Sequence, residues 1–370
     1  MKQLTATQSS SALLRCTVIA VDLAKRVFQV AGEDRLGQVI YEDRIRSREA
    51  FAAFLRNLPA GVTVLMETGP GAQAWARQLL GQGHTARILP AQHVATHRSG
   101  HKNDRNDALA ILRAGHDSQI KAVPIKSVQA LAMQALHRAR SGYVGRRTAL
   151  SNQMRGLLLE HGIAMAKGDA SLVQGVSRAI AEVNQPVPEV LRELLAELLA
   201  EWEQLGVRIE ALTGKLKASA SQDPKARQLM TVRGIGPVIA TAVIAKQVEP
   251  ERFSNARDFA AYFGVAPNQD SSGEKKRLGK MSRRGDGYLR SMMVEGAQAV
   301  LRALDTQSQQ PDDRRLQRWM SRHGRKGAAI RLANRNFRIV WAMLQNDQSY
   351  KRQMPRRAEL EDMQEIAMND

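Results

Sequence analysis

The sequence predicts an α/β domain with a mixed central sheet, then a long helical segment, then a mainly helical second domain. The first prediction rests on short β-branched runs that alternate with turns and helical patterns over residues 16–123. The second rests on helical periodicity through residues 124–222, and the third on apolar helices bounded by glycines in residues 223–348. The polar residues 1–15 and the highly charged residues 349–370 are predicted to be flexible tails.

Buried strands are predicted wherever short apolar runs are rich in β-branched residues. The runs cover residues 17–21, 27–30, 39–41, 62–66 and 85–89. Helical spacing is found at residues 47–58, with Ser47 as the N-cap, and again at residues 71–80 and 104–114. Strands that give way to alternating helices and strands indicate a mixed sheet with helices packed against it.

A heptad seam marks the helical segment. Its apolar residues recur in steps of four and three at Leu191, Leu195, Leu198, Trp202, Leu205, Ile209, Leu212 and Leu216. Such a seam can pack within its own chain as a long helical hairpin, or it can form a coiled coil between subunits. The spacing alone favours neither. A break is expected at residues 219–226, around Asp223 and Pro224.

Composition points to a nucleic-acid partner. Lys and Arg number 55 against 36 Asp and Glu, a formal charge of +19, which attracts polyanions. The alternative is a basic protein without a specific partner. Cys16 is the single cysteine, so neither an intrachain disulfide nor a cysteine-rich zinc site is possible. We see no signal peptide and no membrane-spanning run, and we expect a cytoplasmic protein.

Four acidic residues are candidates for a metal site. Asp22 and Glu67 each end a predicted strand, and Asp104 and Asp107 lie three apart at a helix start, on one face. Carboxylates gathered at one point repel one another unless a cation neutralises them, and oxygen ligands suit Mg²⁺. Taken singly, each residue has another explanation, as a turn former or as a helix N-terminal acid. Their combination favours metal.

Glycines precede an apolar helix in the second domain. Gly234 and Gly236 flank Ile235, and Pro237 then opens the helix. This pattern is typical of the hairpin in a helix-hairpin-helix element, whose backbone N–H groups contact phosphate. A tight turn between core helices is the alternative.

The densest basic run follows a loop of small residues at 270–273. It consists of Lys275, Lys276, Arg277, Lys280, Arg283 and Arg284, with few acids between them. Clustered near Gly and Ser, these residues favour contact with a nucleic-acid backbone, which would depend strongly on salt. A solvated loop is the alternative.

The motifs in the first domain resemble those of DEDD transposases of bacterial insertion sequences, the family numbered one-ten. They are Ile19-Ala20-Val21-Asp22, Met66-Glu67-Thr68-Gly69 and Lys102-Asn103-Asp104-Arg105-Asn106-Asp107-Ala108. The resemblance implies a ribonuclease-H-like domain similar to the RuvC Holliday-junction resolvase. It also implies that Asp22, Glu67, Asp104 and Asp107 are ligands of Mg²⁺ or Mn²⁺.

The second domain also resembles this family, through Gly264-Val265-Ala266-Pro267, Ser271-Ser272-Gly273, Lys280-Met281-Ser282-Arg283-Arg284-Gly285-Asp286 and Leu289-Arg290. The Gly-Asp before Leu-Arg is similar to the subgroup numbered eleven-eleven. The resemblance implies that Ser272 is the nucleophile, with Ser271 as the less favoured neighbour.

The same resemblance implies a composite site shared between subunits of a homo-oligomer, a dimer or a tetramer, with the helical segment as a coiled-coil arm. Its implied partners are DNA and a structured guide RNA encoded by the element, and its implied location is the bacterial cytoplasm, in association with the nucleoid. The expected activity is cutting and rejoining of DNA. The alternatives are a site-specific invertase, a RuvC-like structure-specific nuclease and a non-enzymatic nucleic-acid-binding scaffold.

Overall fold

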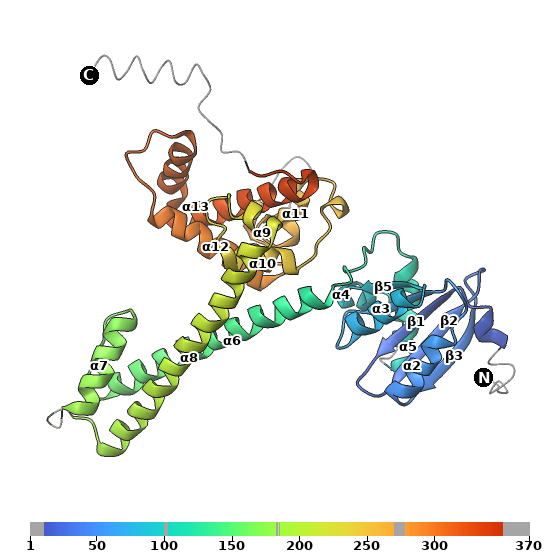
Figure 1. The fold of residues 1–370 in the computed structure, drawn as a ribbon, viewed down its shortest axis with the longest axis horizontal. Coiled ribbons are helices and arrows are strands. Elements are labelled where there is room, and N and C mark those ends of the chain that lie inside the picture. Colours follow the sequence, from blue (N-terminus) through green and yellow to red (C-terminus); the bar gives the residue numbers. More distant parts are fainter. Residues whose placement is uncertain (1–10, 100–102, 183, 185, 270–277, 351–370) are drawn as a thin grey trace, which may run out of the picture. The chain divides into compact units, whose positions relative to one another are not determined.

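The structure, a computed structural model, describes residues 11–99, 103–182, 184, 186–269 and 278–350 (Figure 1). The chain divides into two units, residues 1–127 and 128–370. Each unit has its own apolar core. The predicted finer division of the second unit at 222/223 stays a prediction.

Unit 1 is built on a five-stranded mixed sheet with the order β3-β2-β1-β4-β5. β1 pairs antiparallel with β2 and parallel with β4, while β2–β3 is antiparallel and β4–β5 is parallel. The strands are β1 (Val18–Leu23), β2 (Phe28–Glu33), β3 (Val39–Ile45), β4 (Thr63–Glu67) and β5 (Thr85–Leu89). All five predicted strands are therefore present, and the mixed α/β domain is confirmed.

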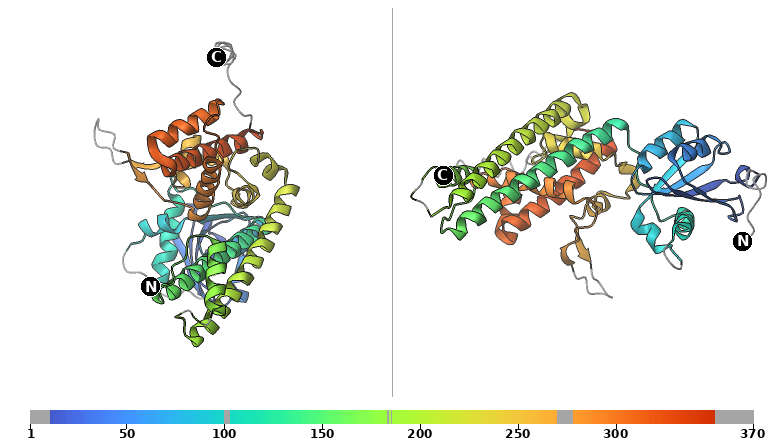
Figure 2. Two further views of the ribbon diagram at one scale, coloured as in Figure 1. Left: turned by 90° about the vertical axis from the view of Figure 1, so that its left-hand side faces the viewer. Right: turned by 90° about the horizontal axis from the view of Figure 1, so that it is seen from below.

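Helices cover both faces of this sheet, as the right-hand view of Figure 2 shows. One face buries Ile19 and Val21 against α2 (Arg48–Arg56) and α3 (Ala72–Gly81). The other face buries Ala20 and Leu65 against α4 (Ala91–Thr96) and α5 (Asp104–His116). Because strand side chains alternate, the parity of a strand residue decides which helices it meets.

The helical segment of unit 2 packs within its own chain. α6 (Val128–Glu160), α7 (Asp169–Ala181) and α8 (Glu189–Gln222) share one apolar cluster. Leu195, Trp202 and Leu205 of the predicted seam are buried there. The indole N–H of Trp202 donates to Ser151 Oγ on α6 at 2.7 Å. The structure therefore shows the hairpin alternative for this part of the seam.

The second core of unit 2 is formed by the remaining elements. They are α9 (Pro224–Leu229), α10 (Pro237–Ala245), the 3₁₀ turn η1 (Pro250–Arg252), α11 (Ala256–Tyr262), β6 (Pro267–Gln269), β7 (Leu278–Met281), α12 (Gly287–Arg302) and α13 (Pro311–Asn346). β6 and β7 form an antiparallel pair. The expected break at residues 219–226 is shorter than predicted: α8 runs to Gln222, Asp223 caps α9, and Pro224 opens that helix.

α13 consists of two helical segments, because Gly324 interrupts it with φ of 65° and ψ of 170°. The chain turns back there. Leu316 before the interruption and Leu332 after it belong to the same core, and Arg335 Nη2 donates to Asp312 Oδ1 at 3.1 Å. Within the described residues, no helix is both long enough and apolar enough to cross a membrane.

Candidate functional site

The strand register brings Asp22 and Glu67 together on one face of the sheet. Val21 of β1 is paired with Met66 of β4, and each acid follows its paired residue directly. Asp22 has the parity of Ala20, and Glu67 has that of Leu65, so both belong to the face that α5 covers. The predicted convergence of these two carboxylates follows from parallel pairing.

The other two acids lie in the first turn of α5. The Asn103 side chain caps this helix by accepting from the Asn106 N–H at 2.8 Å, which fixes the helix to start at Asp104. Asp104 and Asp107 therefore lie three residues apart on one helical face. The helix packs against β1, and this brings the second pair of acids to the first.

The other three carboxylates are close enough to Asp22 to influence its ionisation. The pKa of Asp22 is raised to about 6 by burial first, and then by the negative charges of Asp107, Glu67 and Asp104. The positive charge of Arg98 opposes this shift. Partial burial and three like charges thus disfavour the ionised form of Asp22, and a cation beside it would favour that form.

Arginines meet the second acid pair. Arg98 Nε lies 2.5 Å from Asp107 Oδ1, and both side chains are largely buried. Arg44 of β3 donates to Asp104 Oδ2 at 3.2 Å, an exposed contact. Arg105 pairs with Glu42 of β3 at 2.5 Å. Sequence reasoning missed Arg44, although strand alternation could have placed it and Glu42 on the α5 face with Ala31 of β2.

The donor set fits a divalent cation, because four carboxylates offer the oxygen ligands that Mg²⁺ and Mn²⁺ prefer. Among the described residues, no three acidic, histidine or cysteine side chains are already gathered for a metal. Asp104 and Asp107 instead form their ion pairs with Arg44 and Arg98. A metal held by these two acids would have to replace Arg44 and Arg98 as their partners.

Gly234 and Gly236 differ in their surroundings. Gly234 has φ of 87°, and a Cβ there would lie 3.0 Å from the Gly296 carbonyl oxygen of α12. Gly234 therefore lets the turn pack tightly against α12, which is the structural alternative for this motif. Gly236 is exposed and precedes α10 directly, and apart from its chain neighbours no described atom lies within 4 Å of the position of a Cβ, so a phosphate has room to approach.

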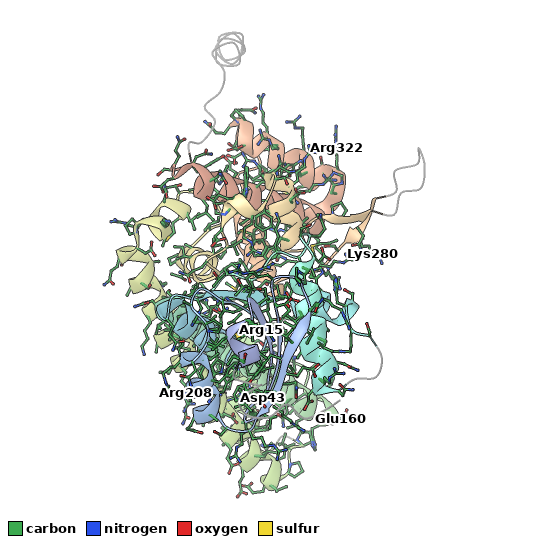
Figure 3. All side chains as sticks on the ribbon, turned by 90° about the vertical axis from the view of Figure 1, so that its right-hand side faces the viewer. Arg15, Asp43, Glu160, Arg208, Lys280 and Arg322 are labelled. Atoms are coloured by element: carbon green, nitrogen blue, oxygen red, sulfur yellow. The ribbon has the colours of Figure 1, made fainter. Side chains whose placement is uncertain are left out.

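Part of the predicted basic run is described. Lys280, Arg283 and Arg284 are exposed on β7 and just after it; Figure 3 labels Lys280. Ser272, Lys275, Lys276 and Arg277 lie outside the described residues. Exposure leaves the three described cations available to a nucleic-acid backbone.

Close backbone contacts hold the two chain segments on either side of the strand pair together. A Cβ on Gly264 would overlap the Arg284 backbone, and one on Gly285 would overlap the Tyr262 carbonyl. Arg290 Nη1 donates to the Phe263 and Arg284 carbonyls at 3.1 and 2.9 Å. These contacts of Gly264, Gly285 and Arg290, together called the clamp, fix the base of the β6–β7 pair. Residues 270–277 join the two strands of that pair.

Asp286 continues this clamp into the next helix. Its side chain caps α12 by accepting from the Leu289 N–H at 2.9 Å, and it forms an ion pair with Lys246 after α10. In the Gly-Asp of the sequence motif, Gly285 therefore allows close contact with the Tyr262 backbone, and Asp286 caps α12.

Two stretches of the chain match known transposase domains. Residues 19–163 match the DEDD transposase domain of the IS110 type, and residues 226–312 match the domain described as "Transposase IS116/IS110/IS902 family". The first range includes all four acids, and the second includes Gly234, Gly236 and Ser272.

Curated relatives match along most of their length. A "Probable family 20 transposase" of Pseudomonas aeruginosa is 39% identical, covering 90% of this chain and 98% of the relative. The "Transposase for insertion sequence element IS1111A" of Coxiella burnetii is 34% identical, covering 90% and 91%. The "Transposase for insertion sequence element IS1328" of Yersinia enterocolitica is 33% identical, covering 88% and 96%.

Proposed function

Since the chain belongs to the IS116/IS110/IS902 family of transposases, which cleave DNA and transfer strands, we propose that it does so with four metal-binding carboxylates and a serine nucleophile. The family also implies dependence on a divalent metal. The proposal adds the ion, Mg²⁺ or Mn²⁺, its ligands Asp22, Glu67, Asp104 and Asp107, and the nucleophile Ser272.

One observation carries the metal part of this proposal. Asp22 is half-buried and has the parity of the sheet face that α5 covers, and its pKa is raised to about 6 by burial and then by the charges of Asp107, Glu67 and Asp104. A partly buried carboxylate with three other carboxylates near enough to raise its pKa is costly when ionised, and a cation lowers that cost. When bound, the cation supplies charge stabilisation at a phosphate that is being cleaved.

The proposed covalent step conserves bonds. The Ser272 hydroxyl loses its proton, and its oxygen forms a P–O bond as one P–O bond of the DNA breaks. The released sugar oxygen takes up a proton. Attack by a hydroxyl of another strand reverses these changes, frees Ser272 and seals the new junction. No external energy source is needed, because each step exchanges one phosphodiester for another.

The proposed partners follow from the charge and from the family. The formal charge of +19 and the exposed Lys280, Arg283 and Arg284 suit DNA and a structured guide RNA. Gly236 and the start of α10 are proposed as a further phosphate contact. We propose a homo-oligomer as the active form. The buried part of the α8 seam is used within the chain, so contacts between subunits would involve other residues.

Trapping a covalent protein–DNA adduct tests the nucleophile. The wild-type chain, incubated with its element DNA, guide RNA and Mg²⁺, is expected to give an adduct on the peptide that contains Ser272. Ser272→Ala should abolish the adduct, and the neighbouring Ser271→Ala is the matched control that should retain it. An adduct on Ser271, or none in wild type under cleaving conditions, would overturn the assignment.

A RuvC-like structure-specific nuclease is the second candidate, because all four acids lie in unit 1 and Ser272 does not. Such an enzyme would need the acids alone. Cleavage that survives Ser272→Ala but is lost in Asp22→Asn would establish it. An invertase would use the same residues and would differ in the DNA sites that it joins.

A further inference from the structure

A groove of about 1030 Å³ lies between the β6–β7 pair and α13. Its walls include Pro267, Gly279 and Met281 from the strand pair and its neighbours, and residues from both segments of α13. The turn at Gly324 brings those two segments to the same groove, since Arg315 and Trp319 precede it and Arg331 follows it.

The lining of this groove is cationic. It includes Arg315, Arg331, Arg335 and Arg338, and no Asp or Glu among the described residues that line it. Arg315 and Arg335 both contact Asp312, at 3.3 and 3.1 Å, so their charge is partly neutralised. Arg331 and Arg338 are exposed, and neither forms a hydrogen bond or ion pair that involves another described residue. Two cations of the groove are therefore available to a ligand.

The spacing of these two cations favours an extended anion. Arg331 and Arg338 are seven residues apart, about 10.5 Å along a helix and on one face of it. Asn334 lies between them, and its side chain donates to the Val265 carbonyl at 3.4 Å, which ties this face to the chain before β6. Two separate phosphates of one strand match this arrangement better than a single small anion.

Flat apolar side chains accompany the charges. Trp319 and Trp341 are half-buried and line the groove. The Trp341 indole N–H donates to the Pro250 carbonyl at 3.0 Å, so its ring is held in place. Cationic grooves with aromatic side chains bind single-stranded nucleic acid, because unpaired bases stack on the rings while the cations meet the backbone. A double helix keeps its bases stacked inside and would leave these rings unused.

We propose that this groove, the α13 groove, binds an unpaired stretch of the DNA strand on which Ser272 acts. The inference rests on the proposed function for its choice of DNA. Residues 270–277, which include Ser272, join β6 to β7, and β7 and its neighbours form one wall of the groove. A strand seated there lies beside the two ends of the segment that carries the nucleophile. Most of the lining residues of α13 lie beyond residues 226–312, the range that matches the family domain.

Binding of a labelled oligonucleotide tests the proposal. The full chain in EDTA is titrated against single-stranded DNA, the same sequence as a duplex, and the same sequence as single-stranded RNA, by fluorescence anisotropy. The double variant Arg331→Gln, Arg338→Gln is expected to weaken single-stranded DNA binding by roughly tenfold or more. It should reduce the slope of log affinity against log salt by about 1.4, since each lost phosphate contact on a single strand contributes about 0.7.

A matched control comes from the same helix. Arg318 and Arg322 are exposed on α13 but do not line the groove, and Figure 3 labels Arg322. The double variant Arg318→Gln, Arg322→Gln removes the same charge and should have the smaller effect. If the two double variants lost equal affinity for single-stranded DNA, the groove would not be the binding site. The binding would then reflect only the general attraction of the positive charge for DNA. An equal loss on duplex, or a loss confined to RNA, would overturn the single-stranded DNA assignment.

The stacking part has its own measurement. Single-stranded DNA that carries 5-iododeoxyuridine should cross-link under ultraviolet light to a peptide containing Trp319 or Trp341. Calorimetry first checks that Trp319→Leu is folded. Its affinity for single-stranded DNA should then be lower than that of the wild type by roughly fivefold or more. Cross-links that map only elsewhere would overturn the groove. Because binding is measured without metal or cleavage, a missing Ser272 adduct with intact groove binding would reject the proposed function alone.

Discussion

Gly285 lies against Tyr262 so closely that a Cβ on the glycine would overlap the tyrosine carbonyl oxygen. The contact joins the end of α11 to the turn before α12, and the hydrogen bond from the Arg283 N–H to the Gly264 carbonyl, 3.2 Å long, lies beside it. Residues 267–281, which contain β6, β7 and Ser272, lie between these points in the chain. The clamp thus holds the base of the strand pair in a fixed geometry.

Gly285→Ala is expected to destabilise the second unit by roughly 3 kcal/mol, because it adds both an overlap and strain at φ of 74°. Differential scanning calorimetry measures the loss. Gly142→Ala is the control, since nothing lies within 4 Å of the Cβ position in the middle of α6. That variant should be neutral or up to about 1 kcal/mol more stable through helix propensity. Similar melting temperatures for the two variants would contradict the clamp.

Arg98→Gln is expected to destabilise the metal-free chain by about 1–3 kcal/mol, because it leaves the largely buried Asp107 without its cation. Arg44→Gln removes an exposed ion pair with Asp104 and should cost less than about 1 kcal/mol. Adding Mg²⁺ should reduce the difference in unfolding free energy between Arg98→Gln and the wild type, since the metal then neutralises Asp107. Thermal unfolding of both variants with and without Mg²⁺ decides this. If Mg²⁺ left the loss of stability in Arg98→Gln unchanged, Asp107 would not be a metal ligand.

His137 is expected to make the stability of unit 2 depend on pH. Its ring nitrogens face Tyr288 Oη at 3.0 Å and Thr241 Oγ1 at 3.1 Å, and its pKa is lowered to about 4 by burial and then by Arg140. In the unfolded chain the ring takes up its proton near pH 6.5, and in the folded chain near pH 4. The contribution of His137 to the free energy of unfolding is therefore constant above pH 6.5 and falls as the pH drops toward 4.

The loss should approach about 1.4 kcal/mol per pH unit within that window. Urea unfolding at a series of pH values measures it, and His137→Gln should flatten the slope. The control is His323→Gln, which changes an exposed histidine of α13. If His137→Gln retained the wild-type slope, other groups would be responsible.

Leu195→Ala tests how the seam of α8 is used. The side chain is fully buried against the α6–α7 cluster, so its removal should cost about 2–5 kcal/mol. Because the packing is within one chain, the cost should not change with protein concentration. Val207→Ala, at a side chain that is 69% exposed on the same helix, should be almost neutral. A cost for Leu195→Ala that varied with concentration would indicate that the seam joins subunits.

The sequence by itself determined the five strands of unit 1 and the positions of Asp104 and Asp107 on one helical face. The β-branched runs gave five strands at the predicted positions, and the spacing of Asp104 and Asp107 behind the Asn103 cap put both on one helical face. These are local properties: a residue's own backbone preference and its near neighbours decide them.

Only the tertiary structure decided which elements pack together and how the heptad seam of α8 is used. Parallel pairing of β1 with β4 set Asp22 beside Glu67, and the packing of α8 on α6 settled how the buried part of the heptad seam is used. The ion pairs of Arg44 and Arg98, the packing of Gly234 on Gly296 and the α13 groove likewise join residues far apart in the chain. Such contacts depend on register and on the direction in which each element leaves its turn, and periodicity along the sequence contains neither.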